Sequence, residues 1–400
     1  MKIHEYQAKK LLKKYGINVP NGNIAYTPEE AKKVAGDISF RGPWYLKAQI
    51  HSSNRQNGKF LEHKAGRGGG IRLAKSKKEV FQEAEKMLGS TLVTTQTRKK
   101  GCIVTKVYVE NEAKIKRRFY ISLVVDRILP AITLLLAETE TDDIMRMCEK
   151  TPEKLMRIPL DFKKGINSLQ IKYIARFLKI KNTELKNLKK LVDIMFKMFL
   201  ELDLTMIELN PAGITKNGEF IAIDAAITID ENALFRHPDL KLFKDNVEKN
   251  RRERLAEKSG FQYVDLDGKI GCIVNGEGLA LNAIDMIEAH GEDVACYLNI
   301  KGGVDKDKII SGIKIIVTNP KVEGILINVL GGFLRCNLVA DGILAAAAEV
   351  GINVPLVVRF VGTNEEEAKD IITNSKLPII IAENMEDSVT KLIKAIRENA

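Results

Sequence analysis

The sequence lacks any long apolar run. No hydrophobic stretch in its 400 residues approaches the roughly 18 that a membrane-spanning helix needs. Its first 16 residues carry lysines where a secretory signal has an apolar core. We therefore expect no membrane partner and a cytoplasmic location.

Cysteine is scarce, and the patterns of several enzyme classes are missing. The five cysteines are an odd number without a close pair, which argues against a disulfide framework or a zinc site and favours a reducing compartment. The five histidines show no HxH or HxxxH pairing, and no Gly-x-Ser-x-Gly elbow is present. A zinc or serine hydrolase is therefore not expected.

Positive charge is in excess but is not concentrated. Sixty-three lysines and arginines face 52 acidic residues, a net charge of +11. The lysines are spread through expected helices and form no basic arm or aromatic-basic groove. This pattern favours anionic small-molecule ligands over nucleic acid.

The first half of the chain mixes helices with antiparallel strands. Helical spacing and a C-terminal glycine predict a helix over His4–Tyr15, and Thr27-Pro28-Glu29-Glu30 is a typical helix start. Three extended runs with short connections predict an antiparallel meander, and a helical tract follows. The runs are Cys102–Glu110, Phe119–Asp126 and Ala131–Ala137, and the tract is Ser168–Glu201.

From about Lys269 the pattern becomes a strict alternation of buried strand and amphipathic helix. Such strands are typical of a doubly wound parallel sheet, because a sheet covered on both faces has no polar side. The charged stretch Glu248–Lys258 lies in the expected linker, residues 246–268. The expected strands are Ile270–Val274, Val294–Ile300, Gly324–Val329, Pro355–Phe360 and Pro378–Ala382, separated by helices at Gly278–Ala289, Lys306–Val317, Leu338–Val350 and Glu365–Asn374.

A hairpin around Asn217 carries the first candidate site. Asn210 and Asp224 are equally far from Asn217, so a tight turn there sets them nearly opposite each other. Together with Glu208, they offer the hard oxygen ligands that Mg²⁺ takes when nucleotide phosphates complete its shell. The alternative is a solvated hairpin with scattered polar residues.

Three other features could bind anions, although each has a simpler explanation. Lys47 ends the expected strand Trp44–Lys47 before a glycine-bearing loop, where it could reach phosphates or extend over the surface. The turns Asn275–Gly278 and Leu330–Leu334 follow parallel strands, where open α/β sheets bind ligands. Glycine also serves in tight turns that bind nothing.

Taken together, these motifs resemble the β subunit of succinyl-CoA synthetases (succinate-CoA ligases) over essentially the whole chain. The resemblance implies an ATP-grasp domain over residues 1–245 and a flavodoxin-like CoA-ligase domain over residues 269–400, hence a chain of α/β and α+β class. The stretches that carry it are Met1–Lys9, Lys47–His51, Thr91–Thr97, Ile207–Pro211, Asn232–Arg236, Asp265–Gly276 and Gly331–Cys336.

The resemblance also implies an acid-thiol ligase of the tricarboxylic acid cycle that uses Mg²⁺ and ATP/ADP, with GTP/GDP possible. Its partner would be an α subunit that binds CoA and carries a phosphorylated histidine, with succinate and phosphate at the subunit contact. The implied roles are nucleotide binding by Lys47, Arg55 and Glu110, Mg²⁺ binding by Asn210 and Asp224, support of the phosphohistidine loop by Glu208, and substrate binding by Asn275, Gly332, Phe333 and Leu334.

Several positions depart from the family pattern. The glycine-rich phosphate loop is replaced by Ser52–Gly58, and a glycine-rich segment, Ala65–Gly70, follows it. Arg118 stands where the family usually has a nucleotide-binding glutamate, and Ala226 where a lysine follows the metal-binding aspartate. Further changes fall at Thr139–Asp142, Leu298–Gly303 and Glu277.

These departures leave alternatives open. The chain could be a catalytically weakened paralogue with a structural subunit role, or the β subunit of a malate-CoA ligase. The sequence does not decide between ATP and GTP, between succinate and malate, or between αβ and α2β2 assemblies. It also leaves open whether loop 52–58 and Arg118 abolish nucleotide binding.

Overall fold

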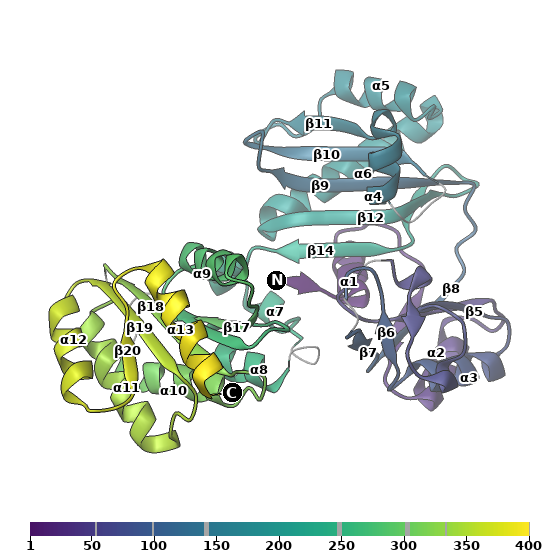
Figure 1. Ribbon diagram of the computed structural model, residues 1–400. Helices are drawn as coiled ribbons and strands as arrows, with labels where there is room; N and C mark the ends of the chain where they lie inside the picture. The colour runs from purple at the N-terminus through teal and green to yellow at the C-terminus, as the bar shows by residue number, and fades with distance from the viewer. Residues whose placement is uncertain are drawn as a thin grey trace. The chain divides into compact units, whose positions relative to one another are not determined.

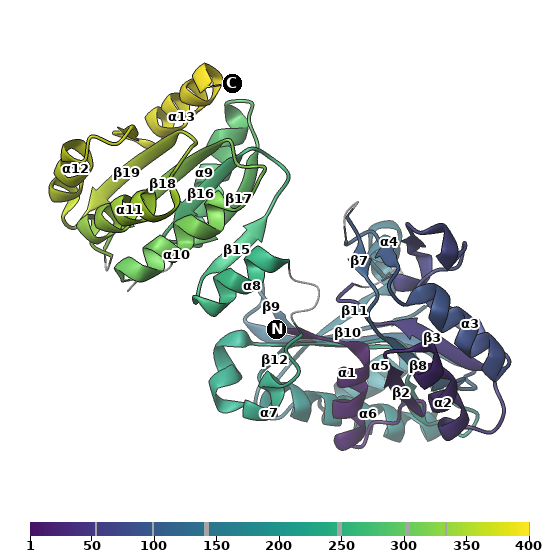
Figure 2. The same ribbon diagram turned by 90° about the horizontal axis from the view of Figure 1, so that it is seen from below.

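The computed structural model describes residues 1–52, 54–97, 100–139, 144–245, 250–300, 305–332 and 334–399 (Figures 1 and 2). The chain divides into two compact units, Met1–Glu248 and Lys249–Ala400. Among the described residues, every helix is too short or too polar to cross a bilayer. The five cysteines form no disulfide.

The first unit contains a seven-stranded antiparallel sheet over the described residues. Its order is β1-β14-β12-β9-β10-β11, with β13 paired to β12. Helix α6 packs on β12 and β9, and the apolar side chains between them form the main core. The strands are β1 (Lys2–Ile3), β9 (Arg117–Asp126), β10 (Ala131–Glu138), β11 (Met156–Leu160), β12 (Leu204–Ile214), β13 (Phe220–Ala222) and β14 (Ala225–Ile229), and the helices are α1 (Glu5–Lys14), α4 (Ile144–Lys150), α5 (Ser168–Phe177), α6 (Asn182–Glu201) and α7 (Pro238–Lys241).

Two smaller sheets complete the first unit. One has the order β2-β8-β3-β5 and the other β4-β6-β7. Helices α2 and α3 pack on the first of these and on each other. Thr27 caps α2 as its sequence predicts, since its hydroxyl accepts a hydrogen bond from the Glu30 amide at 3.1 Å. The elements are β2 (Gly22–Ala25), α2 (Pro28–Ile38), β3 (Trp44–Ala48), β4 (Lys59–Phe60), β5 (Ile71–Ala74), α3 (Lys77–Met87), β6 (Thr91–Val93), β7 (Cys102–Ile103) and β8 (Val107–Asn111).

The second unit confirms the predicted doubly wound sheet. Five parallel strands lie in the order β17-β16-β18-β19-β20, and β15 adds an antiparallel edge. Helices α9 and α13 cover one face, and α8, α10, α11 and α12 contribute to the core on the other. The elements are α8 (Arg251–Lys258), β15 (Gln262–Asp265), β16 (Ile270–Val274), α9 (Glu277–Ala289), β17 (Val294–Asn299), α10 (Lys306–Val317), β18 (Gly324–Gly331), α11 (Cys336–Val350), β19 (Leu356–Gly362), α12 (Glu365–Asn374), β20 (Ile379–Ile381) and α13 (Met385–Asn399).

The structure differs from the sequence predictions at three places. The run Cys102–Glu110 divides into β7 and β8, which join different sheets. Of the three expected runs, only Phe119–Asp126 and Ala131–Ala137 therefore pair with each other, as β9 and β10, and β11 extends that pair. The helical tract is interrupted at Lys179, whose backbone is left-handed with φ 49°. Residues 246–268, expected to be a linker, contain α8 and β15, because Ala256, Phe261 and Tyr263 pack into the core of the second unit.

A close backbone contact generates a prediction about Gly69. A Cβ atom added there would lie 1.9 Å from the carbonyl oxygen of Gln56, so the loop would have to move. We expect Gly69→Ala to lower the free energy of unfolding by about 1–3 kcal/mol, the usual cost of overpacking. The control is Gly278→Ala in the first turn of α9, where nothing lies within 4 Å. Urea unfolding should show a loss only for Gly69→Ala; equal stability of the two variants would contradict this packing.

Candidate nucleotide-binding site

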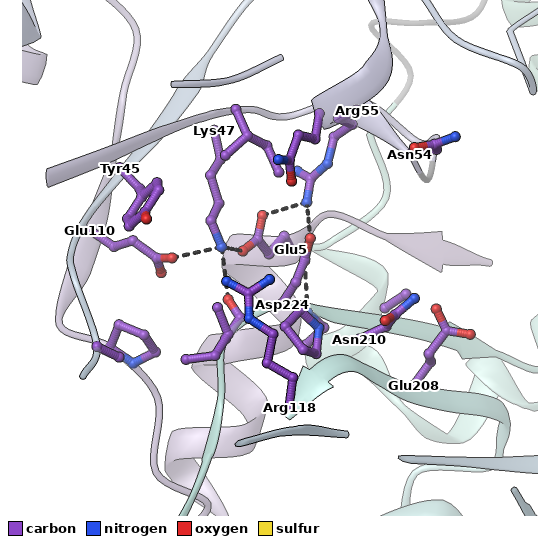
Figure 3. A pocket seen from close by; sticks show the side chains of 18 of the residues that line it. Glu5, Tyr45, Lys47, Asn54, Arg55, Glu110, Arg118, Glu208, Asn210 and Asp224 are labelled. Atoms are coloured by element: carbon purple, nitrogen blue, oxygen red, sulfur yellow. Dashed lines mark hydrogen bonds and ion pairs between the residues drawn. The ribbon is translucent and has the colours of Figure 1, made fainter. Parts of the chain in front are cut away.

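A cavity of about 610 Å³ lies within the first unit (Figure 3). Residues from α1, from strands β3, β8, β9 and β12, and from the loop after β3 line it. The cavity brings together all six residues of this unit to which the sequence analysis assigned a binding or catalytic role, namely Lys47, Arg55, Glu110, Glu208, Asn210 and Asp224.

The antiparallel pairing of β3 with β8 places Lys47 beside Glu110. Tyr45 pairs directly with Glu110, and Lys47 lies two residues further along the same face of β3. The Lys47 ammonium and a Glu110 carboxylate oxygen are consequently 2.6 Å apart, and both side chains are buried. A residue that could have been a solvent-exposed lysine is therefore part of a buried ion pair.

Glu5, at the start of α1, lies at the centre of this charge cluster. One carboxylate oxygen is 2.8 Å from the Lys47 ammonium and 2.9 Å from that of Lys9, and the other is 2.7 Å from the guanidinium of Arg55. Arg55 also contacts Asp224 at 2.6 Å. Three cations and three carboxylates, the third being Glu110, thus neutralise one another inside the unit.

The two lysines use every donor they have. Lys47 donates to Glu5, to Glu110 and, at 2.8 Å, to the carbonyl oxygen of Ile223. Lys9 donates to the same two carboxylates and to the same carbonyl at 2.6 Å. Because an ammonium group has three N–H donors, both are saturated. The shared bonds to Ile223 fix the backbone immediately before Asp224.

The pKa values reflect this mutual neutralisation. Burial acts to raise the pKa of Glu5, but the attraction of Lys47, Lys9 and Arg55 outweighs it and holds that pKa well below its usual range. Burial acts to lower the pKa of Lys47, yet Glu110 and Glu5 raise it. Arg55 follows the same pattern, with Asp224 and Glu5 raising its pKa against burial. The charged forms of Glu5, Lys47 and Arg55 are therefore favoured at neutral pH.

Asn210 and Asp224 lie opposite each other, as counting from Asn217 predicts. The Asn210 amide donates to the Asp224 carbonyl at 3.2 Å, in register with the pair Leu209 and Ala225. The Asp224 carboxylate has two different partners. Its Oδ1 accepts a hydrogen bond from the Ala225 amide at 2.8 Å, and its Oδ2 contacts the Arg55 guanidinium. Within the described residues no group of three or more His, Cys, Asp or Glu side chains could hold a metal by itself. This donor set fits a cation that takes its other ligands from a nucleotide.

Glu208 lies two residues before Asn210 on β12. Its carboxylate accepts a hydrogen bond from the Tyr120 hydroxyl at 3.0 Å. Burial raises the pKa of Glu208, and the charge of Asp224 raises it further, although the Tyr120 bond acts in the opposite direction. Among the described residues Glu208 forms no ion pair with the cations of the cluster. Its pKa is raised while that of Glu5 is lowered, so Glu208 is protonated more readily than Glu5.

The loop after β3 does not present its glycines to the cavity. Arg55–Asn57 forms a 3₁₀ turn, within which the Asn57 and Gly58 amides bond to the carbonyls of Asn54 and Arg55. Asn54 has a left-handed backbone with φ 57°. The segment Ala65–Gly70 packs on this turn, with the Gly70 amide bonded to the Arg55 carbonyl at 2.8 Å, and does not line the cavity.

The residues predicted in the second unit form a separate cluster. The Asn275 side chain donates to the Leu330 carbonyl at 2.7 Å and accepts from its amide at 2.8 Å, so it ties the two glycine-bearing turns together. Gly332 is exposed and Leu334 is buried, while Phe333 lies outside the described residues. The Thr363 amide also holds the Gly331 carbonyl at 2.9 Å.

Fold and cavity together define an ATP-grasp protein joined to a CoA-ligase domain. The ATP-grasp family model matches residues 2–214, and the CoA-ligase model matches residues 273–393. The structure is similar to that of ATP citrate lyase from Methanothrix soehngenii, with a TM-score of 0.74, 15% identity and coverage of 98% of this chain and 99% of that one. At this identity the likeness shows the fold alone.

Two relatives match the sequence along its whole length. The succinate–CoA ligase [ADP-forming] subunit beta of Acidiphilium cryptum is 44% identical over 401 residues, and that of Rhodospirillum rubrum is 43% identical over 399 residues. Each alignment covers 100% of both chains. The chain belongs to the family of succinate–CoA ligase β subunits.

Sequence reasoning missed the roles of Glu5 and Lys9. Both are fully buried, although they are four residues apart on α1, a spacing at which a glutamate and a lysine commonly pair on an exposed helix face. The one signal was their position in Met1–Lys9, a stretch that carries the family resemblance.

The shared contacts of Glu5 predict a large effect of its neutralisation. Glu5→Gln would leave Lys9, Lys47 and Arg55 facing two carboxylates, and we expect a loss of about 3–5 kcal/mol in the free energy of unfolding, the usual cost of breaking a buried ion pair. The matched control is Glu83→Gln, which removes a less buried partner of Arg72 and Lys86. Chemical denaturation compares the two, and equal losses would show that Glu5 is an ordinary ion-pair partner.

His4 predicts how stability depends on pH. Burial, together with the nearby His51 and Lys106, lowers the pKa of His4 from 6.5 to about 3, despite its bond to Asp245. Between these values the unfolded chain binds a proton that the folded chain does not, so stability should fall with decreasing pH by about 1.4 kcal/mol per unit from this group. Denaturant titrations between pH 7 and 5 should show this slope in the wild type and a shallower one in His4→Gln. Identical slopes would refute the assignment.

Proposed function

We propose that the chain is the β subunit of a succinate–CoA ligase, which couples the interconversion of succinyl-CoA and succinate to phosphorylation of a nucleoside diphosphate. The observation that carries the proposal is the convergence of six sequence-predicted residues, from five segments of the chain, in one cavity of about 610 Å³. The full-length similarity to β subunits from two bacteria supports the same assignment.

In this proposal the cavity binds the nucleotide. Lys47, Arg55 and Glu110 position it, and Asn210 and Asp224 hold Mg²⁺ through an amide and a carboxylate oxygen. Bound Mg²⁺ supplies neutralisation of the phosphate charge and alignment of the transferred group. Because Asp224 Oδ2 contacts Arg55, Asp224 would exchange its Arg55 contact for the metal when the metal binds at this oxygen. Glu5 gives Arg55 a second carboxylate that remains after this exchange.

The proposal includes an α subunit as partner. The α subunit would bind CoA and carry the histidine that passes phosphate between succinyl phosphate and the nucleotide, and Glu208 would support that histidine's loop. Asn275, Gly332, Phe333 and Leu334 would line the succinate and phosphate site at the subunit contact. The place of this reaction would be the tricarboxylic acid cycle in the cytoplasm.

The names of the relatives favour ATP/ADP over GTP/GDP. A second candidate function, a weakened paralogue with a structural role, is favoured by the loop after β3, whose Asn57 and Gly58 amides are already bonded within the turn. A malate-CoA ligase would share the same cavity and differ at the acid. Turnover with each nucleotide and each acid separates these candidates.

The experiment is a coupled assay of the purified chain with its α subunit, succinate, CoA and Mg-ATP. We expect turnover only when both subunits are present, and a loss of roughly a hundredfold or more in Asp224→Asn, as when one charged contact to a transition state is removed. Asp193→Asn, the same change at an exposed ion pair on α6, is the control and should be neutral. Turnover by the β chain alone, or full activity of Asp224→Asn, would refute the proposal; stable pairing without turnover would favour the paralogue.

A further inference from the structure

The cations around the cavity differ in whether they already have acidic partners. Lys9, Lys47 and Arg55 are buried, and each contacts two carboxylates. Lys47 has no N–H donor left, and Arg55 additionally donates to the carbonyl oxygen of Ala48 at 2.9 Å. A phosphate group can therefore reach Lys9 and Lys47 only by replacing a partner that they hold now, and at Arg55 it meets a guanidinium whose charge two carboxylates already neutralise.

Arg118 and Lys114, in contrast, have no acidic partner among the described residues. Both line the cavity, both are exposed, and within the described part of the chain neither forms an ion pair. Lys2 also lines the cavity, but its ammonium donates to the carbonyl oxygen of His51 at 3.2 Å. Arg118 and Lys114 are therefore the cavity-lining cations whose side chains have neither an acidic partner nor a hydrogen bond among the described residues.

Arg118 is the better placed of these two. It lies on β9, where its backbone pairs with Gly213 of β12, whereas Lys114 lies in the segment between β8 and β9. Figure 3 shows the Arg118 side chain extending into the cavity toward the end of Lys47. A guanidinium group presents a planar set of donors that matches two phosphate oxygens at once.

We propose that Arg118 is a phosphate-binding residue of this site, which meets the nucleotide phosphates with a charge that no carboxylate among the described residues neutralises. The inference rests on the proposed function, since it assumes that the cavity takes a nucleotide. It assigns an attractive role to a position where the sequence analysis found a departure from the family pattern. Arg118 thereby offsets the phosphate contacts that the loop amides of Asn57 and Gly58 cannot make while they bond within their turn.

The same charge balance explains why one residue should matter. The buried cluster has three cations and three carboxylates, so its field on an approaching anion is small. Arg118 adds an unbalanced charge at the exposed side of the cavity. Its contribution should therefore grow with the number of phosphates on the ligand and fall as ionic strength rises.

The test is calorimetric titration of the full chain with adenosine, Mg-ADP and Mg-ATP. In Arg118→Gln we expect the Kd for ATP to rise roughly tenfold or more, as for the loss of a charge-assisted hydrogen bond, with a smaller rise for ADP and none for adenosine. Arg118→Lys should restore part of the affinity. Arg127→Gln, at another exposed arginine beyond the end of β9, is the control and should bind like the wild type.

The outcomes separate this inference from the proposed function. Wild-type affinity of Arg118→Gln for ATP would overturn the inference and leave the nucleotide site standing, as would an equal loss for adenosine, which would place Arg118 on the base or ribose. If Lys114→Gln alone weakened ATP binding, the phosphate contact would belong to Lys114. A wild-type chain that binds none of the three ligands, alone or with its α subunit, would overturn both proposals.

Discussion

The buried carboxylate of Glu5 is the interaction on which the site depends. A charge removed from water must be neutralised nearby, and Glu5 is neutralised by three cations that come from a helix, a strand and a loop. Those cations in turn hold Glu110, Asp224 and the Ile223 carbonyl. Strand β8, the loop after β3 and the hairpin of the larger sheet are thereby fixed around one cavity.

This arrangement determines what the site can do when a ligand binds. The cluster is neutral and its two lysines have no donor left, so a polyanion gains little by approaching it unless contacts are exchanged. Asp224 is the one member of the cluster that has both an Arg55 contact and the position opposite Asn210 that a metal would use. In the proposed function, metal and phosphate binding would consequently be linked, because a phosphate that attracts Arg55 would also free the Asp224 oxygen that a cation needs. Arg118, which has no ion pair among the described residues, lies outside this exchange.

The sequence was sufficient to predict those features of the fold and the site that depend on a local pattern. The alternation of apolar strands and amphipathic helices predicted the sheet of the second unit, with α10 and α12 at their observed bounds. Counting residues from Asn217 placed Asn210 opposite Asp224, because the register of a tight hairpin follows from its turn.

The sequence was insufficient to predict those features that depend on contacts between residues far apart in the chain. Nothing in the spacing of Glu5 and Lys9 shows that they are buried, since their distant partners lie between residues 47 and 223. The run Cys102–Glu110 has uniform strand propensity, and only tertiary pairing assigns its two halves to different sheets. Likewise, the glycines of Ala65–Gly70 are typical of a phosphate loop, but in the structure Gly69 and Gly70 pack against the turn at Arg55.

The chain belongs to the succinate–CoA ligase β subunits, and in the proposed function it would supply the nucleotide and the metal while the α subunit carries the phosphate acceptor. The most direct measurement is a single-turnover transfer from γ-³²P-labelled ATP and Mg²⁺ in the reconstituted complex, quenched and separated by subunit. The account predicts acid-labile label on the α subunit, formed only when this chain is present and discharged by succinate and CoA. Label retained on this chain, or label that forms on the α subunit when this chain is absent, would contradict the account.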